Sequence, residues 1–226
     1  MKLLAIETSS NACSVALGLD GEVIDRHVVE PRAHTDILMP MIAGLLDDAG
    51  IVPADLDAVV LGNGPGSFIG MRIGASVAQG ICFAAEVDII PVSSLAAVAA
   101  EALDCSDAAR VAVTQDARMQ EVYVGIFKRG PEDLPVAEVD EYISAVGSLE
   151  IGGQPCSVAG DGWNRYPELM KRGSGAVLDQ LQVRFPRARF LLPMAETAAD
   201  TAMPADQLVP AYLRQKVAEK PAQPAG

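Results

Sequence analysis

The stretch of the sequence best suited to binding chemistry is the glycine-rich run Gly62–Gly74, GNGPGSFIGMRIG, which lies between two apolar segments. Backbone N–H groups at a glycine-rich turn between a strand and a helix can hold an anion such as phosphate. The chain contains no Gly-Lys dipeptide, so the Walker lysine is absent, and Ile69 occupies the third glycine position of a dinucleotide loop. The run therefore favours a tight turn over an active nucleotide site.

Other residues that could carry chemistry are few. His27 and His34 form neither an H-x-x-x-H nor an H-E-x-x-H metal-binding pair. Ser67 does not lie in a G-x-S-x-G elbow, because Pro65 and Ile69 occupy the glycine positions. A Ser-His-Asp triad is defined by geometry and stays open, although nothing in the sequence favours it.

Composition limits the class of protein. Half of the 226 residues are hydrophobic and 21% are charged, so the chain can bury a large core. A net charge of −13 disfavours direct binding to nucleic acid or to an anionic membrane. The four cysteines include no C-x-x-C pair, and we find neither a signal-peptide core nor a long uncharged apolar run. We therefore expect a soluble, cytoplasmic protein with no membrane span.

The elements that would position these residues begin with a meander of three strands, at residues 2–6, 13–19 and 22–29, with a hairpin turn at Asp20-Gly21. A helix follows over 35–49, with Thr35 as N-cap and Gly50 at its end. Strands at 58–61 and 89–92 then alternate with a helix from Ser67 to about residue 85 and another from Ser93 or Ser94. This order predicts an α/β lobe.

The second half repeats this order in weaker form. Strands are predicted at 111–114, 121–127 and 136–142, followed by helices at 164–171 and 176–185. The polar tail EKPAQPAG is predicted to be disordered. We therefore expect an N-terminal lobe over residues 1–103, a smaller lobe over 104–205, and a segment over 206–226 that returns to the first lobe.

Small residues recur every four positions along the second helix, at Gly66, Gly70, Gly74 and Ala78. Such a stripe lets another backbone approach closely. Periodicity alone leaves two interpretations open, because the helix could cover its own sheet or form a subunit interface.

Several ordered motifs together resemble the TsaB family, also called YeaZ. The resemblance is strong through about residue 127, returns at 160–162 and 210–214, and is weak between. It rests on LLAIETSSNACSVAL, GNGPGSFIGMRIGASVAQGICFA, VSSLAAVA, DARMQEVYVGIF, GDG and PAYLR. It implies the two-lobed actin-like ATPase fold of acetate and sugar kinases, heat-shock chaperones and actin. It also implies a non-catalytic subunit of the bacterial complex that makes tRNA threonylcarbamoyladenosine.

The resemblance further implies which partners this subunit meets. TsaD would carry the catalytic metal and transfer threonylcarbamoyl to N6 of the adenosine 3′ of the anticodon, in tRNAs that read codons beginning with A. The ATPase TsaE would join the pair, tRNA would be met only indirectly, and the isolated chain would form a homodimer. No cofactor is expected on this chain itself, beyond weak nucleotide binding.

The resemblance assigns candidate site residues by motif. The first two helices would form the partner interface, and the residues expected in it are Thr35, Leu38, Met41, Ile42, Leu45, Gly70, Ile73, Gly74, Val77 and Ile81. The turn that holds phosphates in kinase relatives matches Glu7-Thr8-Ser9-Ser10, with Glu where Asp is commoner. We expect a remnant nucleotide cleft formed by Glu7, Thr8, Ser9, Asn63, Gly64 and Asp161, although Asp161 also fits a simple tight turn.

Two alternatives belong to the enzyme class. An active small-molecule kinase or ATPase would use Glu7 and the two glycine turns. A peptidase, suggested by older names of related proteins, needs a nucleophile or a metal site that we do not find in the sequence.

Overall fold

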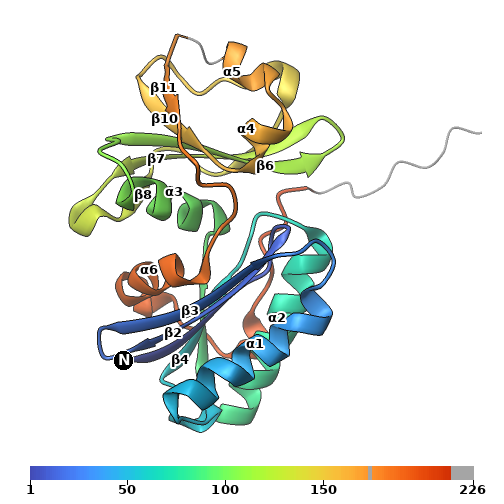
Figure 1. Cartoon of the computed structure of the whole chain (residues 1–226), viewed down its shortest axis with the longest axis vertical. Coiled ribbons are helices and arrows are strands. Elements are labelled where there is room, and N and C mark those ends of the chain that lie inside the picture. The colour runs from blue at the N-terminus through green and yellow to red at the C-terminus, as the bar shows by residue number, and fades with distance from the viewer. Residues whose placement is uncertain (173–174, 215–226) are drawn as a thin grey trace, which may run out of the picture.

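The computed structural model describes residues 1–172 and 175–214, which form two β-sheets with helices between them and on their outer faces (Figure 1). Lobe I is the sheet of β1–β5 with α1 and α2, and its strand order is β3-β2-β1-β4-β5. Its elements are β1 (Lys2–Glu7), β2 (Ala12–Leu19), β3 (Glu22–Val29), α1 (His34–Ala49), β4 (Ala58–Gly62), α2 (Phe68–Ala85) and β5 (Asp88–Val92).

Local sequence signals account for most of lobe I. β1, β2 and β3 form the predicted antiparallel meander, and Asp20 and Gly21 adopt φ values of 47° and 97° in the hairpin turn. β4 and β5 extend the sheet as parallel strands. Ser67 caps α2 by accepting a hydrogen bond from the N–H of Gly70, as its position predicts.

The start of α1 differs from the prediction. The helix begins at His34 with Ala33 as N-cap, so Thr35 lies inside the first turn and is exposed. The imidazole of His34 lies 3.1 Å from the carbonyl oxygen of Ala12 and ties this turn to β2. The helix has no side-chain cap, and this tertiary contact positions its first turn instead. Gly50 ends the helix in the left-handed region, as predicted.

Lobe II is the second sheet with α4 and α5, and its strand order is β11-β10-β6-β7-β8. Read from the β8 edge, as β8-β7-β6-β10-β11, this order repeats that of lobe I. The repeated order confirms that the two halves have related topology. Its elements are β6 (Arg110–Arg118), β7 (Glu121–Arg129), β8 (Pro135–Ala137), β9 (Tyr142–Ala145), β10 (Cys156–Ala159), α4 (Asp161–Arg165), α5 (Glu168–Arg172) and β11 (Val177–Gln180).

Three predictions for lobe II were wrong in part. The third meander strand is broken into β8 and β9, which pair with different parts of β7, and the break places Glu141 against the hydroxyl of Ser93. The predicted helix at 164–171 is split into α4 and α5, because Pro167 cannot continue a helix and disfavours helical geometry at Tyr166. The predicted helix at 176–185 contains the strand β11 instead, since parallel pairing with β10 overrides its weak helical pattern.

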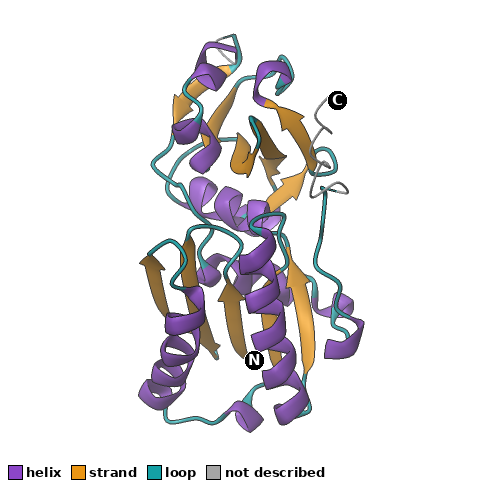
Figure 2. Ribbon diagram, turned by 90° about the vertical axis from the view of Figure 1, so that its right-hand side faces the viewer, coloured by secondary structure: helices purple, strands orange, loops and turns teal. Residues whose placement is uncertain are grey.

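The two lobes share one hydrophobic core. Between the sheets lie α3 (Ser94–Asp104), which packs on β6 and β7, and α6 (Leu191–Thr197), which packs on β4 and β5 (Figures 1 and 2). Buried residues of both sheets, such as Leu3 and Val113, belong to the same cluster as these helices. The outer faces carry separate clusters, under α1 and α2 in lobe I and around Trp163 in lobe II.

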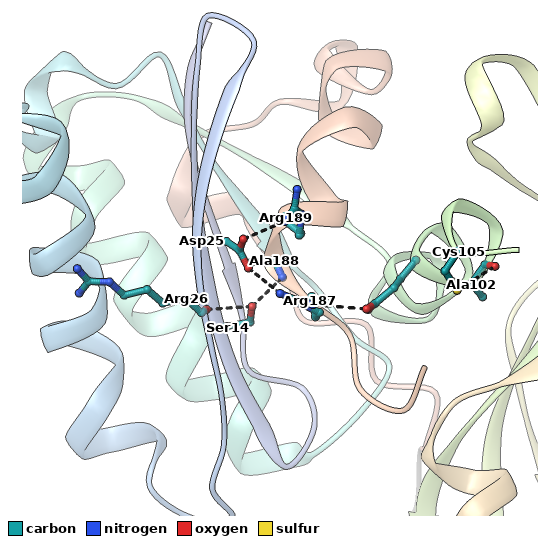
Figure 3. Close-up of polar contacts among 9 residues, drawn as sticks. Ser14, Asp25, Arg26, Ala102, Cys105, Arg187, Ala188 and Arg189 are labelled. Atoms are coloured by element: carbon teal, nitrogen blue, oxygen red, sulfur yellow. Dashed lines mark hydrogen bonds and ion pairs between the residues drawn. The ribbon is translucent and has the colours of Figure 1, made fainter. Parts of the chain in front are cut away.

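The chain returns to lobe I earlier than residue 206, where we expected it. Arg187 donates to Asp25 on β3 at 3.0 Å and forms an ion pair with Glu101 on α3 at 3.6 Å (Figure 3). Arg189 donates to the other carboxylate oxygen of Asp25, and the N–H of Ala188 donates to Ser14 on β2. This segment therefore connects β3 to the helix layer between the sheets. The predicted disordered tail lies outside the described residues.

Candidate functional site

The carboxylate that would act in a kinase relative is sealed inside the protein. Glu7 is fully buried, and its oxygens accept hydrogen bonds from the N–H of Ser9 at 2.5 Å and the hydroxyl of Ser94 at 2.6 Å. Burial raises the pKa of the Glu7 carboxyl to about 7, and the hydrogen bonds from Ser94 and Ser9 only partly oppose this rise. A Cβ at position 62 would overlap the Glu7 carboxylate, so Gly62 makes the room in which it lies.

The six residues predicted to form the remnant cleft do not form one site. A cleft of about 420 Å³ lies between the lobes, and of these six only Ser9 and Asp161 line it. Thr8 is buried, and its hydroxyl donates to the carbonyl of Gly70 at 2.8 Å. Gly64 is also buried and donates its N–H to the hydroxyl of Ser94. The predicted cleft was therefore wrong for Glu7, Thr8 and Gly64.

Asn63, the last member of the predicted set, is also bonded to another part of the chain. Its side-chain amide donates to the carbonyl of Val209 at 3.1 Å. In lobe II the carboxylate of Asp161 is likewise bonded within the chain, because Arg184 donates two hydrogen bonds to one of its oxygens. Within residues 1–172 and 175–214, no three His, Cys, Asp or Glu side chains gather as a metal-binding group would require.

The small-residue stripe of α2 packs inside the chain. A Cβ at Gly66 would overlap Ser9, and one at Gly70 or Gly74 would overlap Thr8. The stripe thus lets the helix lie against the turn that follows β1. This contact decides between the two interpretations left open by the sequence, and the subunit-interface interpretation of the stripe was wrong.

Most residues predicted for the partner interface are equally inaccessible. Six of the ten belong to the interior of lobe I, namely Leu38, Met41, Ile42, Leu45, Gly70 and Gly74. Thr35 is exposed, and Ile73, Val77 and Ile81 are partly buried. The periodicity had identified the face of each helix that covers the sheet, and only these four residues reach the surface.

An apolar groove nonetheless lies between the two predicted helices. The α1–α2 groove has a volume of about 420 Å³ and is lined by His34, Thr35, Leu38, Met39, Phe68, Ile69, Arg72, Ile73, Ser76 and Val77. Met39 and Ile69 are 51% and 69% exposed, and together with Phe68 they give the groove a contiguous apolar lining. The prediction missed Met39 and Phe68, although each is an apolar residue outside the core-facing stripe of its helix.

The length and composition of α2 alone would also permit a membrane span. In the structure the helix packs on the sheet of lobe I through buried residues that include Ala75, Ala78 and Cys82, and it carries Arg72 near its start. A helix in the core of a soluble protein can have the same length and hydropathy, so these two properties do not identify a membrane protein.

Comparisons with known proteins agree with the resemblance found in the sequence. The family model described as TsaD, tRNA N6-adenosine threonylcarbamoyltransferase, matches residues 28–221. The tRNA threonylcarbamoyladenosine biosynthesis protein TsaB of Escherichia coli (strain K12) is 37% identical over 97% of both chains. The protein of the same name from Haemophilus influenzae is 32% identical over 97% of this chain and 96% of its own length.

A solved structure shows the same relationship in three dimensions. YeaZ from Pseudomonas aeruginosa matches with a TM-score of 0.85 and 35% identity, covering 94% of this chain and 99% of that chain. Together with the repeated sheet order, these similarities confirm the predicted two-lobed actin-like ATPase fold. The chain belongs to the TsaB family, also called YeaZ.

Proposed function

We propose that this protein acts in tRNA threonylcarbamoyladenosine biosynthesis as the non-catalytic subunit that pairs with TsaD, and that TsaE joins the pair. The observation that carries the proposal is the α1–α2 groove, in which Met39, Phe68 and Ile69 stay exposed although the chain has a large core. Exposed apolar grooves of this kind mark protein interfaces. The occupant we propose is the corresponding helical face of TsaD, or a second copy of this chain when TsaD is absent.

The burial of Glu7 supports the non-catalytic part of the proposal. A carboxylate that positions a metal ion or a water must face the substrate. Glu7 is instead enclosed by Ser9, Ser94 and Gly62 and has no exposed surface. The family resemblance implies that the catalytic metal would be in TsaD. The net charge of −13 supports indirect contact with tRNA, and we place the protein in the cytoplasm, where tRNA is modified.

The groove can be tested with one charge and a matched control. Ile69→Glu places a carboxylate in the groove, whereas Leu178→Glu on β11 changes a side chain of nearly equal exposure, 70% against 69%, in lobe II. We expect Ile69→Glu to abolish co-purification with TsaD and to lower tRNA threonylcarbamoyladenosine in cells, because a charge buried at an interface without a partner costs several kcal/mol. Leu178→Glu should change neither. Retention of both complex and modification by Ile69→Glu would refute the groove assignment.

The non-catalytic role needs a separate measurement. Purified protein without partners should not hydrolyse ATP or phosphorylate small molecules. ATP turnover that follows the pure protein and is lost in Glu7→Gln would replace our proposal with the kinase or ATPase alternative. The mass of the isolated chain in solution, with and without Ile69→Glu, tests whether the same groove forms a homodimer.

A further inference from the structure

The motif Pro210–Arg214, PAYLR, has no role in the function proposed above, yet the structure places it at the boundary between the lobes. Residues 209–211 are fixed to lobe I by two hydrogen bonds with Asn63, which directly follows β4. The N–H of Ala211 donates to the carbonyl of Asn63 at 3.1 Å, and the amide of Asn63 donates to the carbonyl of Val209, also at 3.1 Å. We call residues 209–214 the strap.

The middle of the strap is held by the first turn of α2. Arg72 donates from Nε to the hydroxyl oxygen of Tyr212 at 3.0 Å. The same guanidinium lies 3.6 Å from the ring centroid of Phe68, and the rings of Phe68 and Tyr212 are 5.5 Å apart. Stacking of an arginine on an aromatic ring adds to the hydrogen bond in fixing this contact. Both Phe68 and Arg72 also line the α1–α2 groove.

The end of the strap is bound to lobe II. Arg214 donates to the carbonyl of Ala117 at 2.9 Å and forms an ion pair with Glu121. Its guanidinium therefore contacts the end of β6 and the start of β7, on the two sides of the turn that joins them. In that turn Arg118, Met119 and Gln120 all have positive φ values, 64°, 56° and 58°. Three successive non-glycine residues in the left-handed region are costly, and surrounding contacts must hold them there.

The strap attaches to both lobes at places different from the earlier connection. The segment containing Arg187 bonds to lobe I at Asp25 on β3 and at Ser14 on β2, and β1 lies between these strands and β4. It leaves lobe II from β11 rather than from the β6–β7 turn. Arg214 also lines the interlobe cleft, whereas Arg187 does not. The strap thus joins the lobes beside the cleft, while α3 and α6 join them through the shared core.

We propose that the strap fixes the angle between the two lobes and so the width of the interlobe cleft, with Arg214 and Tyr212 as positioning residues. Without the strap, the shared core under α3 and α6 would still connect the lobes, but no hydrogen bond or ion pair among the described residues would link the glycine-rich loop to the β6–β7 turn. The proposal concerns the isolated chain and does not depend on a partner.

Distance measurement by pulsed electron paramagnetic resonance between two spin labels tests this directly. Labels are introduced by Val52→Cys in lobe I and Leu178→Cys in lobe II, which are 57% and 70% exposed, in a Cys105→Ser background that removes the exposed native thiol. We expect one narrow interlobe distance in this parent protein. Arg214→Met should broaden or shift the distribution, because it removes the three contacts of the guanidinium with the β6–β7 turn, to the carbonyl of Ala117, the sulfur of Met119 and the carboxylate of Glu121.

Arg118→Met is the matched control. Arg118 lines the same cleft, but its ion pair is with Asp116 on its own strand, so its loss should leave the distance unchanged. Glu121→Gln should give a smaller broadening, since Arg214 keeps its bond to the carbonyl of Ala117, and it also serves if Arg214→Met does not fold. A parent-like distribution in folded Arg214→Met, or in Glu121→Gln where that variant must serve, overturns the proposal. Equal broadening by Arg118→Met overturns it as well.

Discussion

Replacing Glu7 with glutamine should make the protein more stable at neutral and alkaline pH and should remove part of its pH dependence. Glutamine matches the neutral form of the carboxyl, since its oxygen can accept from the N–H of Ser9 and its amide can donate to the hydroxyl of Ser94. The folded protein holds this carboxyl with a pKa of about 7, whereas the ordinary value is 4.5. The folded state therefore binds the proton more tightly than the unfolded state.

The size and the pH range of the effect follow from linkage. Below pH 4.5 the carboxyl is protonated in both states, so the pKa shift changes nothing. Between pH 4.5 and about 7 the unfolded state ionises and the folded state does not, so the free energy of unfolding falls progressively. Above pH 7 the loss is complete, and at about 1.4 kcal/mol per pKa unit it reaches about 3 kcal/mol.

Urea unfolding of the native protein and of Glu7→Gln, followed by circular dichroism across this range, measures the difference directly. Between about pH 5.5 and pH 8, Glu7→Gln should gain about 2 kcal/mol relative to the native protein. Glu141 is a second, half-buried carboxyl with a pKa raised to about 7 by desolvation, so some pH dependence should remain in the Glu7→Gln background. A stability difference that does not change with pH would refute the reasoning, because it would mean that Glu7 is ionised in the fold or reaches water.

Two further predictions concern packing and ion pairs. Gly70→Ala should lower the free energy of unfolding by about 2 kcal/mol, since the new Cβ overlaps the carbonyl of Thr8, whereas Gly80→Ala on the same helix meets open space and should raise it by up to about 1 kcal/mol. Equal thermal midpoints for these two variants would contradict the packing of α2. Arg187→Met should cost about 2 kcal/mol, because Asp25 and Glu101 lose a common partner. An unchanged urea midpoint would show that Arg187 contributes nothing to stability.

Sequence periodicity predicted the elements of lobe I because its signals are local. Asp20-Gly21 specifies a tight turn, and Ser67 and Gly50 mark helix ends, whatever the rest of the chain does. Lobe II was less predictable because its short elements depend on distant pairing. The segment 177–180 becomes a strand only because β10 lies beside it, and no local pattern contains that information.

The candidate site shows a different limit. The spacing of Gly66, Gly70 and Gly74 correctly indicated a close backbone approach, but spacing does not say which backbone approaches. Likewise, apolar periodicity on α1 and α2 identifies the buried face of each helix and gives no signal for the exposed face. Leu38 was therefore predicted and Met39 was not. Glu7 was placed in a cleft because its motif is that of a phosphate turn. Only the three-dimensional contacts with Ser94 and Gly62 reveal that it is enclosed.

Each helix between the sheets packs on the sheet formed by the other half of the chain, α3 on lobe II and α6 on lobe I. This arrangement has a consequence for synthesis on the ribosome. The sheet of lobe I is complete at Val92, but the helix that covers its second face is α6, which begins only at Leu191. Meanwhile α3, which follows β5 directly, packs on strands that have not yet been made. The nascent first half therefore carries an uncovered apolar sheet face and an unpaired apolar helix, so we expect stable folding only after nearly the whole chain has been released.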